Sequence, residues 1–341
     1  MPLEKATLHT LVQTTGLSLA TVSRALSGSS RVLPATRERV LRAAQELGYV
    51  RDRAALHLKT GRTQVLAFIM DRPDASQPGF QALLLGLGES VQGSDYQLIV
   101  LPDDPQDPLA SVRYVVERGM ADGLVLAHTT PQDARVNWLQ QRGFPFVTHG
   151  RTQPLATHGH VDFDNGRFAA RAVEALASRQ RRRLGLLLPM PGSAFRGHLD
   201  QGFRATCERP VLAGRGLTGQ VIEAISLDDS PEALYQWARA HAADFDGLVV
   251  SREAPVLPLL GALADARLQV GRDIDLALKY SSPLPRYLRQ PLLTCFEDLH
   301  LAGLTLGRSL IAHLIQPDQA VAQVLFEPPA IQFPPTLLNP H

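Results

Sequence analysis

Apolar residues recur at helical spacing in the first fifty positions of the chain and in short continuous runs after them. Over residues 7–48 the spacing follows the i, i+3, i+4 rhythm of amphipathic helices, which predicts three short helices. Later apolar runs alternate with helical patterns, and these runs are 65–70, 97–100, 123–126, 146–147, 184–188, 247–250 and 274–278. Apolar strands separated by helices are typical of parallel sheets. The predicted fold class is α/β, with a helical N-terminal domain followed by two Rossmann-like parallel-sheet subdomains.

The segment between the first two predicted helices has the composition of a tight turn. Gly16 adopts left-handed backbone angles at little cost, and Ser18 can cap free amides at the start of the second helix. Two short helices joined in this way form a helix-turn-helix. The second helix, 19–26, is expected to place its N-terminal residues in the major groove of DNA, as recognition helices do.

The second helix carries residue types that read DNA. Leu19 and Ala20 offer apolar contact to a thymine methyl, while Thr21 and Ser23 can reach bases or phosphates. Arg24 is the candidate for direct readout of guanine, with a phosphate clamp as the alternative. Other candidate DNA-binding residues are Ser18 and, as backbone contacts that set the register, Thr7, Ser27, Arg31 and Thr36.

Charge is distributed unevenly along the 341 residues. Residues 1–62 hold ten Lys or Arg against four Asp or Glu, a balance of +6, which leaves −5 for the rest of a chain whose formal net charge is +1. A basic head on a mildly acidic body is expected when one end of a protein meets a polyanion. A solvated basic surface would give the same numbers, so charge alone does not decide between the two.

Three tracts of the helical region follow one another in a distinctive order. They are Thr21-Val22-Ser23-Arg24-Ala25-Leu26-Ser27-Gly28, then Thr36-Arg37-Glu38-Arg39-Val40, then Glu46-Leu47-Gly48-Tyr49. In order and without gaps, they resemble the DNA-binding domain of the LacI/GalR family of transcriptional regulators. The resemblance implies a regulator that binds a double-stranded, near-palindromic DNA operator as a homodimer.

The resemblance also implies a hinge segment, here 51–60, that folds into a helix only on DNA. In that family the two hinge helices of a dimer enter the minor groove, and a leucine from each wedges open the central base step. Leu58 matches that leucine and Ala55 the face toward the partner hinge, with an ordinary linker as the alternative. Two departures stand out: Arg51-Asp52 replaces the usual Pro-Asn, so a weaker hinge helix is expected, and Leu33 replaces a Ser/Thr N-cap typically worth about 1 kcal/mol.

The region after the hinge resembles the effector domain of the periplasmic binding protein type I fold that is joined to this head. In such domains the chain crosses between two subdomains, here expected near residues 162–165, 295–299 and 325. The predicted domains are 1–50 (helix-turn-helix), 51–62 (hinge helix and linker), 63–163 with 297–325 (N-subdomain) and 164–296 with 326–341 (C-subdomain).

Polar residues that follow the predicted strands are the candidate effector site, because ligands of open α/β folds bind beyond the carboxyl ends of the strands. The candidates are Asp71, Phe80, His149, Arg151, Arg196, His198, Ser251, Arg252, Lys279 and Tyr280. A polar rim with an aromatic ring suits a sugar, and the His149-Gly150-Arg151 tract resembles members that answer to glucosides. For each residue singly, a surface loop is an equal alternative. The expected mechanism is allosteric, with a small molecule, a sugar or glucoside, shifting the subdomains and the hinge spacing.

Two other classes of protein fit the sequence less well. An enzyme is disfavoured because no nucleophile elbow, P-loop, HExxH or dinucleotide fingerprint is present, and no cofactor or metal is expected. The Gly86-Leu87-Gly88 tract is interpreted as helix packing, and His158-Gly159-His160 as a polar loop rather than half a metal site. A sugar-binding receptor without a DNA role would require export, whereas no signal peptide or membrane segment is seen, so we expect a cytoplasmic protein. Cys207 and Cys295 are predicted to be buried and unpaired.

Overall fold

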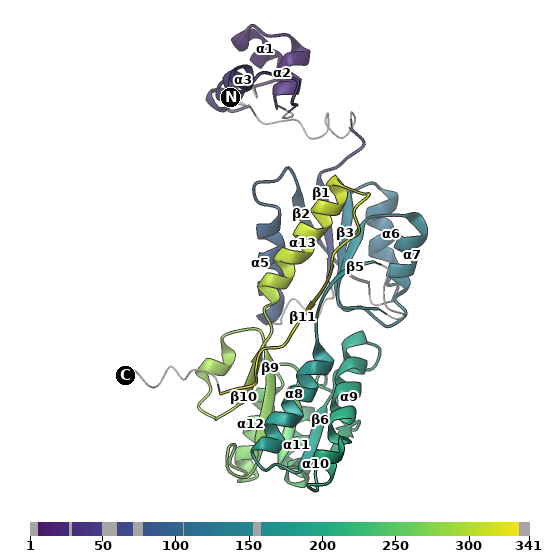
Figure 1. The fold of residues 1–341 in the computed structure, drawn as a ribbon, viewed down its shortest axis with the longest axis vertical. Helices are drawn as coiled ribbons and strands as arrows, with labels where there is room; N and C mark the ends of the chain where they lie inside the picture. Colours follow the sequence, from purple (N-terminus) through teal and green to yellow (C-terminus); the bar gives the residue numbers. More distant parts are fainter. Residues whose placement is uncertain are drawn as a thin grey trace, which may run out of the picture. The chain divides into compact units, whose positions relative to one another are not determined.

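The computed structural model describes residues 6–26, 29–49, 60–70, 78–104, 106–152 and 158–333. The chain divides into two compact units, Met1–Thr63 and Gln64–His341. The described residues of the first unit form helices, and those of the second form sheets with helices beside them (Figure 1). This arrangement confirms the predicted fold class.

In the described residues of the first unit, three helices surround a small apolar core. Its helices are α1 (Leu8–Thr15), α2 (Leu19–Leu26) and α3 (Pro34–Glu46). The buried core residues come from all three helices and the loop before α3: Leu11, Val22, Ala25, Val32, Val40, Ala43 and Ala44. The Arg39 side chain of α3 also donates to the carbonyl of Thr15 at 2.6 Å, which ties α3 to the end of α1.

The first sheet of the second unit has six parallel strands in the order β11-β5-β4-β3-β1-β2. Its strands are β1 (Val65–Met70), β2 (Gln97–Pro102), β3 (Gly123–Leu126), β4 (Phe146–His149), β5 (Gly159–Phe163) and β11 (Gln323–Phe326). The helices between or beside these strands are α5 (Pro78–Ser90), α6 (Ala110–Glu117), α7 (Ala134–Arg142) and α13 (Leu299–Ile315). Apolar side chains fill both faces of the sheet, as continuous apolar strands require.

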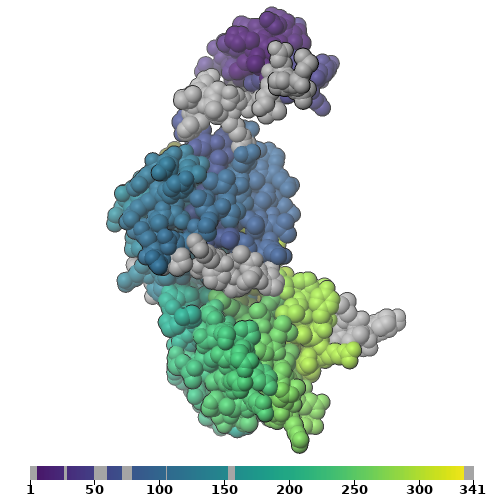
Figure 2. Space-filling model, turned by 180° about the vertical axis from the view of Figure 1, so that it is seen from behind, coloured from purple at the N-terminus to yellow at the C-terminus, as the bar shows by residue number. Residues whose placement is uncertain are grey.

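The second sheet has five parallel strands in the order β10-β9-β8-β6-β7. Its strands are β6 (Arg183–Leu187), β7 (Thr218–Ile222), β8 (Gly247–Val250), β9 (Asp275–Tyr280) and β10 (Leu293–Phe296). The helices are α8 (Asn165–Ser178), α9 (Ala194–Cys207), α10 (Pro210–Ala213), α11 (Pro231–His241), α12 (Val256–Asp265) and the short 3₁₀ turns η2 (Ala242–Asp244) and η3 (Leu284–Tyr287). In the space-filling view of Figure 2 the second unit forms a blue lobe, which contains most of the first sheet, and a green lobe, which contains the second sheet.

The chain crosses between the two sheets three times. The first crossing joins β5 to α8, whose N-cap is Asp164, and the second joins β10 to α13, whose N-cap is Asp298. The third follows β11, after which Gln332 forms an antiparallel bridge with Thr294 of β10. Each described strand is therefore assigned to one of the two sheets. The residue limits of the two subdomains remain a prediction.

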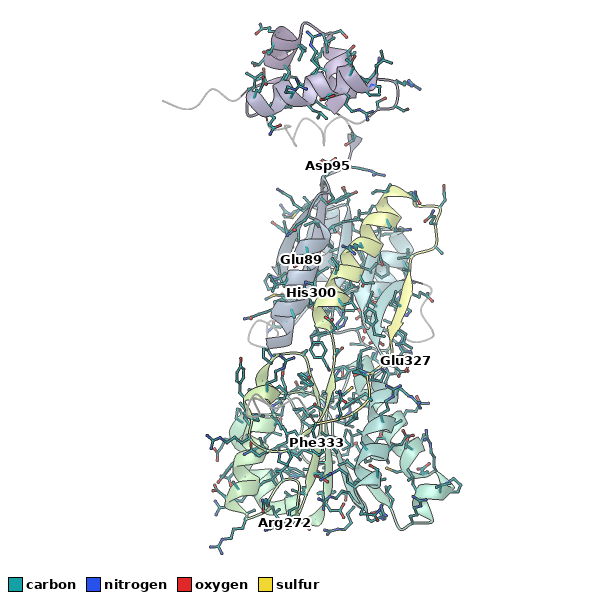
Figure 3. The ribbon with its side chains drawn as sticks, turned by 60° about the vertical axis from the view of Figure 1, so that its left-hand side comes forward. Glu89, Asp95, Arg272, His300, Glu327 and Phe333 are labelled. Carbon is teal, nitrogen blue, oxygen red and sulfur yellow. The ribbon has the colours of Figure 1, made fainter. Side chains whose placement is uncertain are left out.

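Small residues allow α5 and α13 to pack closely on one face of the first sheet. A Cβ at Gly86 would lie 2.0 Å from the carbonyl oxygen of His300, and a Cβ at Gly303 would lie 2.1 Å from that of Leu83. Near this contact Nε2 of His300 lies 3.1 Å from Oε2 of Glu89 (Figure 3). The interpretation of Gly86 as a packing residue is confirmed.

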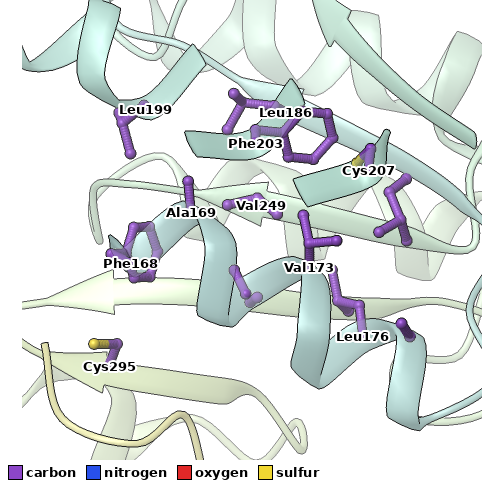
Figure 4. Packing of buried hydrophobic residues seen from close by; sticks show 14 of the residues in the cluster. Phe168, Ala169, Val173, Leu176, Leu186, Leu199, Phe203, Cys207, Val249 and Cys295 are labelled. Atoms are coloured by element: carbon purple, nitrogen blue, oxygen red, sulfur yellow. The ribbon is translucent and has the colours of Figure 1, made fainter. Parts of the chain in front are cut away.

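The core of the second lobe lies between α8, α9 and the sheet. Phe168, Phe203 and Leu199 are fully buried there (Figure 4). Cys207 and Cys295 belong to the same cluster and form no disulfide. Burial raises the pKa of the Cys207 thiol to about 11 and that of Cys295 to about 12, so both are protonated at neutral pH. Their predicted role as small buried hydrophobic residues is confirmed.

The structure corrects the sequence interpretation at His158-Gly159-His160. The tract is not a polar loop, because Gly159 and His160 begin the buried strand β5, which pairs with β4 and β11. A Cβ at Gly159 would lie 2.0 Å from Cγ1 of Val321, so glycine is required by packing. The His158 ring stacks on Phe146 at 5.1 Å. This strand was missed in the sequence because its glycine, histidine and aspartate leave no continuous apolar run.

His158 is a buried neutral imidazole. Its Nε2 lies 2.9 Å from Oγ1 of Thr148, and Nδ1 finds no hydrogen-bond partner in the part of the chain that the structure describes. Burial lowers its pKa from 6.5 to about 4. Burial likewise lowers the pKa of His149, His160 and His198. These imidazoles therefore resist protonation in the folded state.

We expect acid to destabilise this unit through His158. Between pH 6.5 and 4 the His158 imidazole binds a proton in the unfolded chain but not in the folded state. The contribution of His158 to the free energy of unfolding is therefore complete above this pH range and is lost as the pH falls through it. Between pH 7.5 and pH 5 the free energy of unfolding is expected to fall by about 2 kcal/mol through His158 alone. Urea unfolding followed by tryptophan fluorescence measures it, because Trp138 and Trp237 both lie in this unit.

The matched variants are His158→Gln, which stays neutral at every pH, and His9→Gln on the first unit. We expect His158→Gln to lose less stability on acidification than the parent protein, and His9→Gln to follow the parent. Equal losses in the parent and in His158→Gln would contradict the assignment.

Candidate DNA-binding and effector sites

The turn between α1 and α2 has the geometry that a helix-turn-helix needs. Gly16 ends α1 with a φ of 63°, in the left-handed region that favours glycine. The Ser18 hydroxyl accepts a hydrogen bond from the backbone N–H of Thr21 at 3.2 Å, so it caps α2. Both sequence predictions are confirmed. Leu33 precedes α3 without a side-chain cap, also as expected.

The recognition helix buries one face and leaves the other open. Val22 and Ala25 lie in the core, while Leu19, Ala20 and Arg24 are exposed. Leu19 is 46% exposed. Leu19, Ala20 and Arg24 therefore form an open surface on the helix that was predicted to enter the groove.

The other predicted DNA-binding residues fall into three groups. Thr21, Ser23 and Thr36 are half-buried, and Ser18, Thr7 and Arg31 are exposed. The hydroxyls of Ser18 and Thr7 also cap α2 and α1. Three residues lie outside the described part of the chain: Ser27, Ala55 and Leu58.

About half of the predicted effector residues lie where strands of the second unit end. His149 is the last residue of β4, and Arg151 follows two positions later. Ser251 and Arg252 come directly after β8, and Lys279 is the penultimate residue of β9. The remaining predicted residues are Arg196 and His198 in α9, Tyr280 at the end of β9, Phe80 in α5, and Asp71, which lies outside the described residues.

Each basic side chain of this set is paired with a carboxylate. Lys279 Nζ lies 2.6 Å from Oε2 of Glu297, and Arg151 Nε 2.7 Å from Oδ2 of Asp162. Arg196 pairs with Glu223 at 2.5 Å, and Arg252 pairs with Asp228. Lys279 also donates to Oδ1 of Asn165 at 2.8 Å. The site therefore offers hydrogen-bond donors and acceptors side by side, with little net charge.

An aromatic ring lies among these ion pairs. The Arg252 guanidinium lies 5.5 Å and the Lys279 ammonium 5.6 Å from the centre of the Phe195 ring, near the start of α9. Lys279 also lies 5.1 Å from the ring centre of Phe163. Phe195 thus connects the ends of β8 and β9 with α9, and sequence reasoning did not identify it.

Two predicted aromatic residues have apolar neighbours instead. Phe80 stacks on Phe68 at 5.8 Å and packs against the core of the first lobe. Tyr280 contacts Phe296 at 5.3 Å and packs against a core cluster of the second lobe. Lys279 and Tyr280 are neighbours on a strand, so their side chains point to opposite faces of the sheet. The structure therefore brings Lys279, but not Tyr280, together with Phe195.

Comparison with known families settles the class of this protein. The family profile described as "Bacterial regulatory proteins, lacI family" matches residues 7–52. The profile described as "Periplasmic binding proteins and sugar binding domain of LacI family" matches residues 63–233, half of the chain. The chain belongs to the LacI family of bacterial regulatory proteins. This LacI-family chain is a DNA-binding transcriptional regulator and not an enzyme.

Individual relatives agree with the family. The regulator AglR of Rhizobium meliloti is 28% identical over 94% of this chain and 91% of its own length. RafR of Escherichia coli is 31% identical over 67% of this chain and 71% of its own. Among solved structures, the lac repressor dimer bound to operator and the anti-inducer ONPF covers 96% of this LacI-family chain with a TM-score of 0.77 at 17% identity. The CelR–cellobiose complex covers 97% with a TM-score of 0.69 at 20% identity.

The acidic partners in the candidate effector site of this LacI-family regulator were missed by sequence reasoning. Asp162 is 11 residues from Arg151, Asp228 is 24 from Arg252, and the partner of Arg196 is 27 residues away. Such spacings carry no periodic signal, because strand order in the sheets brings the partners together. Among the residues that the structure describes, no helix is long and apolar enough to cross a membrane, and no group of three or more His, Cys, Asp or Glu could hold a metal ion.

Proposed function

We propose that this LacI-family regulator is a cytoplasmic repressor that binds a near-palindromic operator as a homodimer. A neutral carbohydrate at the strand ends of the second unit controls it. The exposed residues Leu19, Ala20 and Arg24 of α2 support the operator contacts, with Arg24 reading guanine. By resemblance to the family, Leu58 of the hinge is assigned to the minor groove and Ala55 to the face toward the partner hinge.

The paired charges of the effector site carry the argument for a neutral ligand. Arg151, Arg196, Arg252 and Lys279 each have a carboxylate partner, so a phosphate or carboxylate ligand would have to displace an acid. Sugar hydroxyls both donate and accept, so they can bond to the two members of an ion pair without separating them. The Phe195 ring offers an apolar surface to the C–H face of a sugar ring.

Buried polar groups around the site favour the same class of ligand. Ser251 is 1% exposed, and its hydroxyl has no hydrogen-bond partner in the described parts of the chain. The buried Glu253 carboxylate accepts hydrogen bonds from the Ser282 hydroxyl at 2.7 Å and from the Ser281 hydroxyl at 3.4 Å. A cellobiose complex among the similar structures is consistent with a saccharide.

Control by the effector follows from the three crossings between the lobes. The ion pairs of Arg151 with Asp162 and of Lys279 with Glu297 involve residues beside the first and second crossings. A ligand that binds one arrangement of the lobes better than another shifts the population toward it. The change reaches DNA through the hinge, with a coupling of typically about 1–3 kcal/mol.

The thermal midpoint of the purified protein tests the ligand class. We expect a neutral saccharide from a panel that includes cellobiose, maltose and raffinose to raise the midpoint by several degrees, because it binds only the folded state. Glucose 6-phosphate at the same concentration should not. Operator binding measured with the active saccharide then distinguishes an inducer from a corepressor. A panel in which only sugar phosphates raise the midpoint would contradict the proposal.

Arg252→Gln and Arg204→Gln are the matched variants. Arg252 contributes to the effector site, whereas Arg204 is exposed on α9 and pairs with Asp200. We expect Arg252→Gln to need at least tenfold more saccharide for the same shift, since a hydrogen bond to a charged group is worth about 1.5–3 kcal/mol. Arg204→Gln should respond like the parent protein. Equal responses of both variants would remove Arg252 from the site.

A further inference from the structure

A cavity of about 210 Å³ lies where the chain crosses between the two sheets. The described residues that line it are His149, Phe163, Phe296, Glu297, Asp298, Leu301, Ala302, Phe326, Glu327 and Pro329. They come from all three crossings: the end of β5, the link from β10 to α13, and the segment after β11. Of these, His149 was predicted for the effector site, and Glu297 is the ion-pair partner of Lys279 in that site. The cavity is therefore a second place at which a ligand could contact the segments that connect the lobes.

The walls of this crossing cavity are mainly aromatic and aliphatic. Phe163, Phe296 and Phe326 contribute rings, and Ala302 and Pro329 add aliphatic surface. Phe296 is 42% exposed, an uncommon state for a large aromatic side chain at the end of a strand. A cavity of this volume holds one ring with a short side chain rather than a disaccharide. The walls thus favour a small ligand with an apolar body.

The ionisable groups around the crossing cavity, apart from His149, are acids. Glu297, Asp298 and Glu327 line it, while no Lys or Arg is found among its described lining residues. Glu297 is neutralised by Lys279. Asp298 caps α13 by accepting from the backbone N–H of Leu301 at 2.8 Å. Glu327 is 68% exposed on its side chain, and its contact with Arg171 is long, at 3.7 Å (Figure 3). A negative potential at the rim would repel anions and attract cations.

The aromatic walls favour a cation as well. Ring faces attract ammonium groups, and the Lys279 ammonium already lies 5.1 Å from the centre of Phe163, one of these walls. Carboxylates beside aromatic faces are a combination that recognises organic cations, since the charge is balanced while the apolar body is covered.

We propose that the crossing cavity binds a small organic cation, an aryl- or alkylammonium. Its apolar body lies against Phe163, Phe296 and Phe326, and its ammonium group faces Asp298 and Glu327. This ligand belongs to a different chemical class from the neutral carbohydrate of the effector site. One regulator would therefore respond to two kinds of small molecule.

The position of the cavity gives this ligand a regulatory consequence, which rests on the proposed function. An occupant would contact all three crossings and would therefore favour one arrangement of the two lobes. Affinity for the ammonium ligand and affinity for the saccharide should then change each other by the same factor, because coupling between two sites is reciprocal.

Binding of three similar probes to the purified full-length protein tests the site without saccharide or DNA. The probes are 2-phenylethylammonium, 2-phenylethanol and 3-phenylpropanoate, which share a ring and differ in charge. In titrations followed by ligand-observed NMR at pH 7, we expect the ammonium to bind at least threefold more tightly than the alcohol, and the carboxylate to bind most weakly. Equal binding of the ammonium and the alcohol, or tighter binding of the carboxylate, would overturn the proposal.

Two variants locate the binding. Glu327→Gln removes an exposed charge, so the fold should survive, and it should weaken the ammonium about threefold while leaving the alcohol unchanged. Ala302→Leu fills the cavity and should weaken both probes at least tenfold. Glu117→Gln, an exposed acid on α6, is the control and should bind like the parent. If Ala302→Leu does not fold, the comparison of Glu327→Gln with Glu117→Gln decides, and equal affinities in those two would overturn the assignment.

A competition experiment separates this proposal from the carbohydrate proposal. Because the two sites share only His149 and Glu297, saturation with an active saccharide should change the ammonium affinity by a finite factor without abolishing binding. Complete competitive displacement would place the amine in the effector site and overturn the second site. Absence of ammonium binding would overturn it too, while leaving the saccharide titration unaffected.

Discussion

Arg24→Ala is expected to lower operator affinity and to remove discrimination at one base pair in each half-site. Arg24 is exposed on the recognition helix, and the opposite face of this helix is buried in the core of the first unit. A bidentate arginine–guanine contact is worth about 1–3 kcal/mol of discrimination, and a homodimer would lose two of them. We therefore expect at least a tenfold loss of affinity for the operator, measured by fluorescence anisotropy.

The control for Arg24→Ala is Arg31→Ala, since Arg31 is also exposed and is assigned to the DNA backbone. Loss of a phosphate contact should weaken all operator variants equally and make the salt dependence of binding shallower. Titrations against operators that carry each of the four base pairs at the contacted position distinguish the two effects. If Arg24→Ala weakened binding uniformly and kept the base preference, Arg24 would be a phosphate clamp.

Lys279→Met is expected to destabilise the second unit and to abolish its response to saccharide. The Lys279 side chain is 10% exposed, and its ammonium bonds to Glu297 and Asn165. Methionine fills similar space but leaves the Glu297 carboxylate, 12% exposed, without its cation. Breaking a buried pair by removing one partner typically costs about 3–5 kcal/mol. Urea unfolding followed through Trp138 and Trp237 measures this loss.

The double variant Lys279→Met with Glu297→Gln tests whether the pair itself is responsible. With both charges removed, no unpaired ion remains, so we expect the double variant to be more stable than Lys279→Met alone. Its response to saccharide should stay absent, because the proposed contacts are gone. Additive losses from the two single changes would show that Lys279 and Glu297 do not interact.

The helix-turn-helix could be predicted because its determinants are local. Apolar spacing placed the core residues Leu11, Val22 and Val40, and the turn needed only Gly16 and Ser18. Each of these signals acts over a few residues, through helix periodicity, backbone angles and capping. The seven apolar runs likewise correspond to β1, β2, β3, β4, β6, β8 and β9.

Two of the strands that were missed, β5 and β11, lack that local signal. β5 alternates glycine, histidine and aspartate with apolar residues, and its burial comes from neighbours on both sides in the sheet. β11 is a strand because it pairs with β5, from which it is separated by the whole second lobe. Pairing between distant segments, rather than local preference, decides such strands.

The sequence by itself determined the α/β class, the recognition helix and the strand ends that carry most of the candidate effector residues, since each follows from short-range periodicity. Only the tertiary structure decided that the arginines and Lys279 at those strand ends are neutralised by carboxylates, that Phe195 joins them, and that three crossings enclose a second, acidic cavity. Strand order places these groups together, and a linear sequence does not record which strands become neighbours.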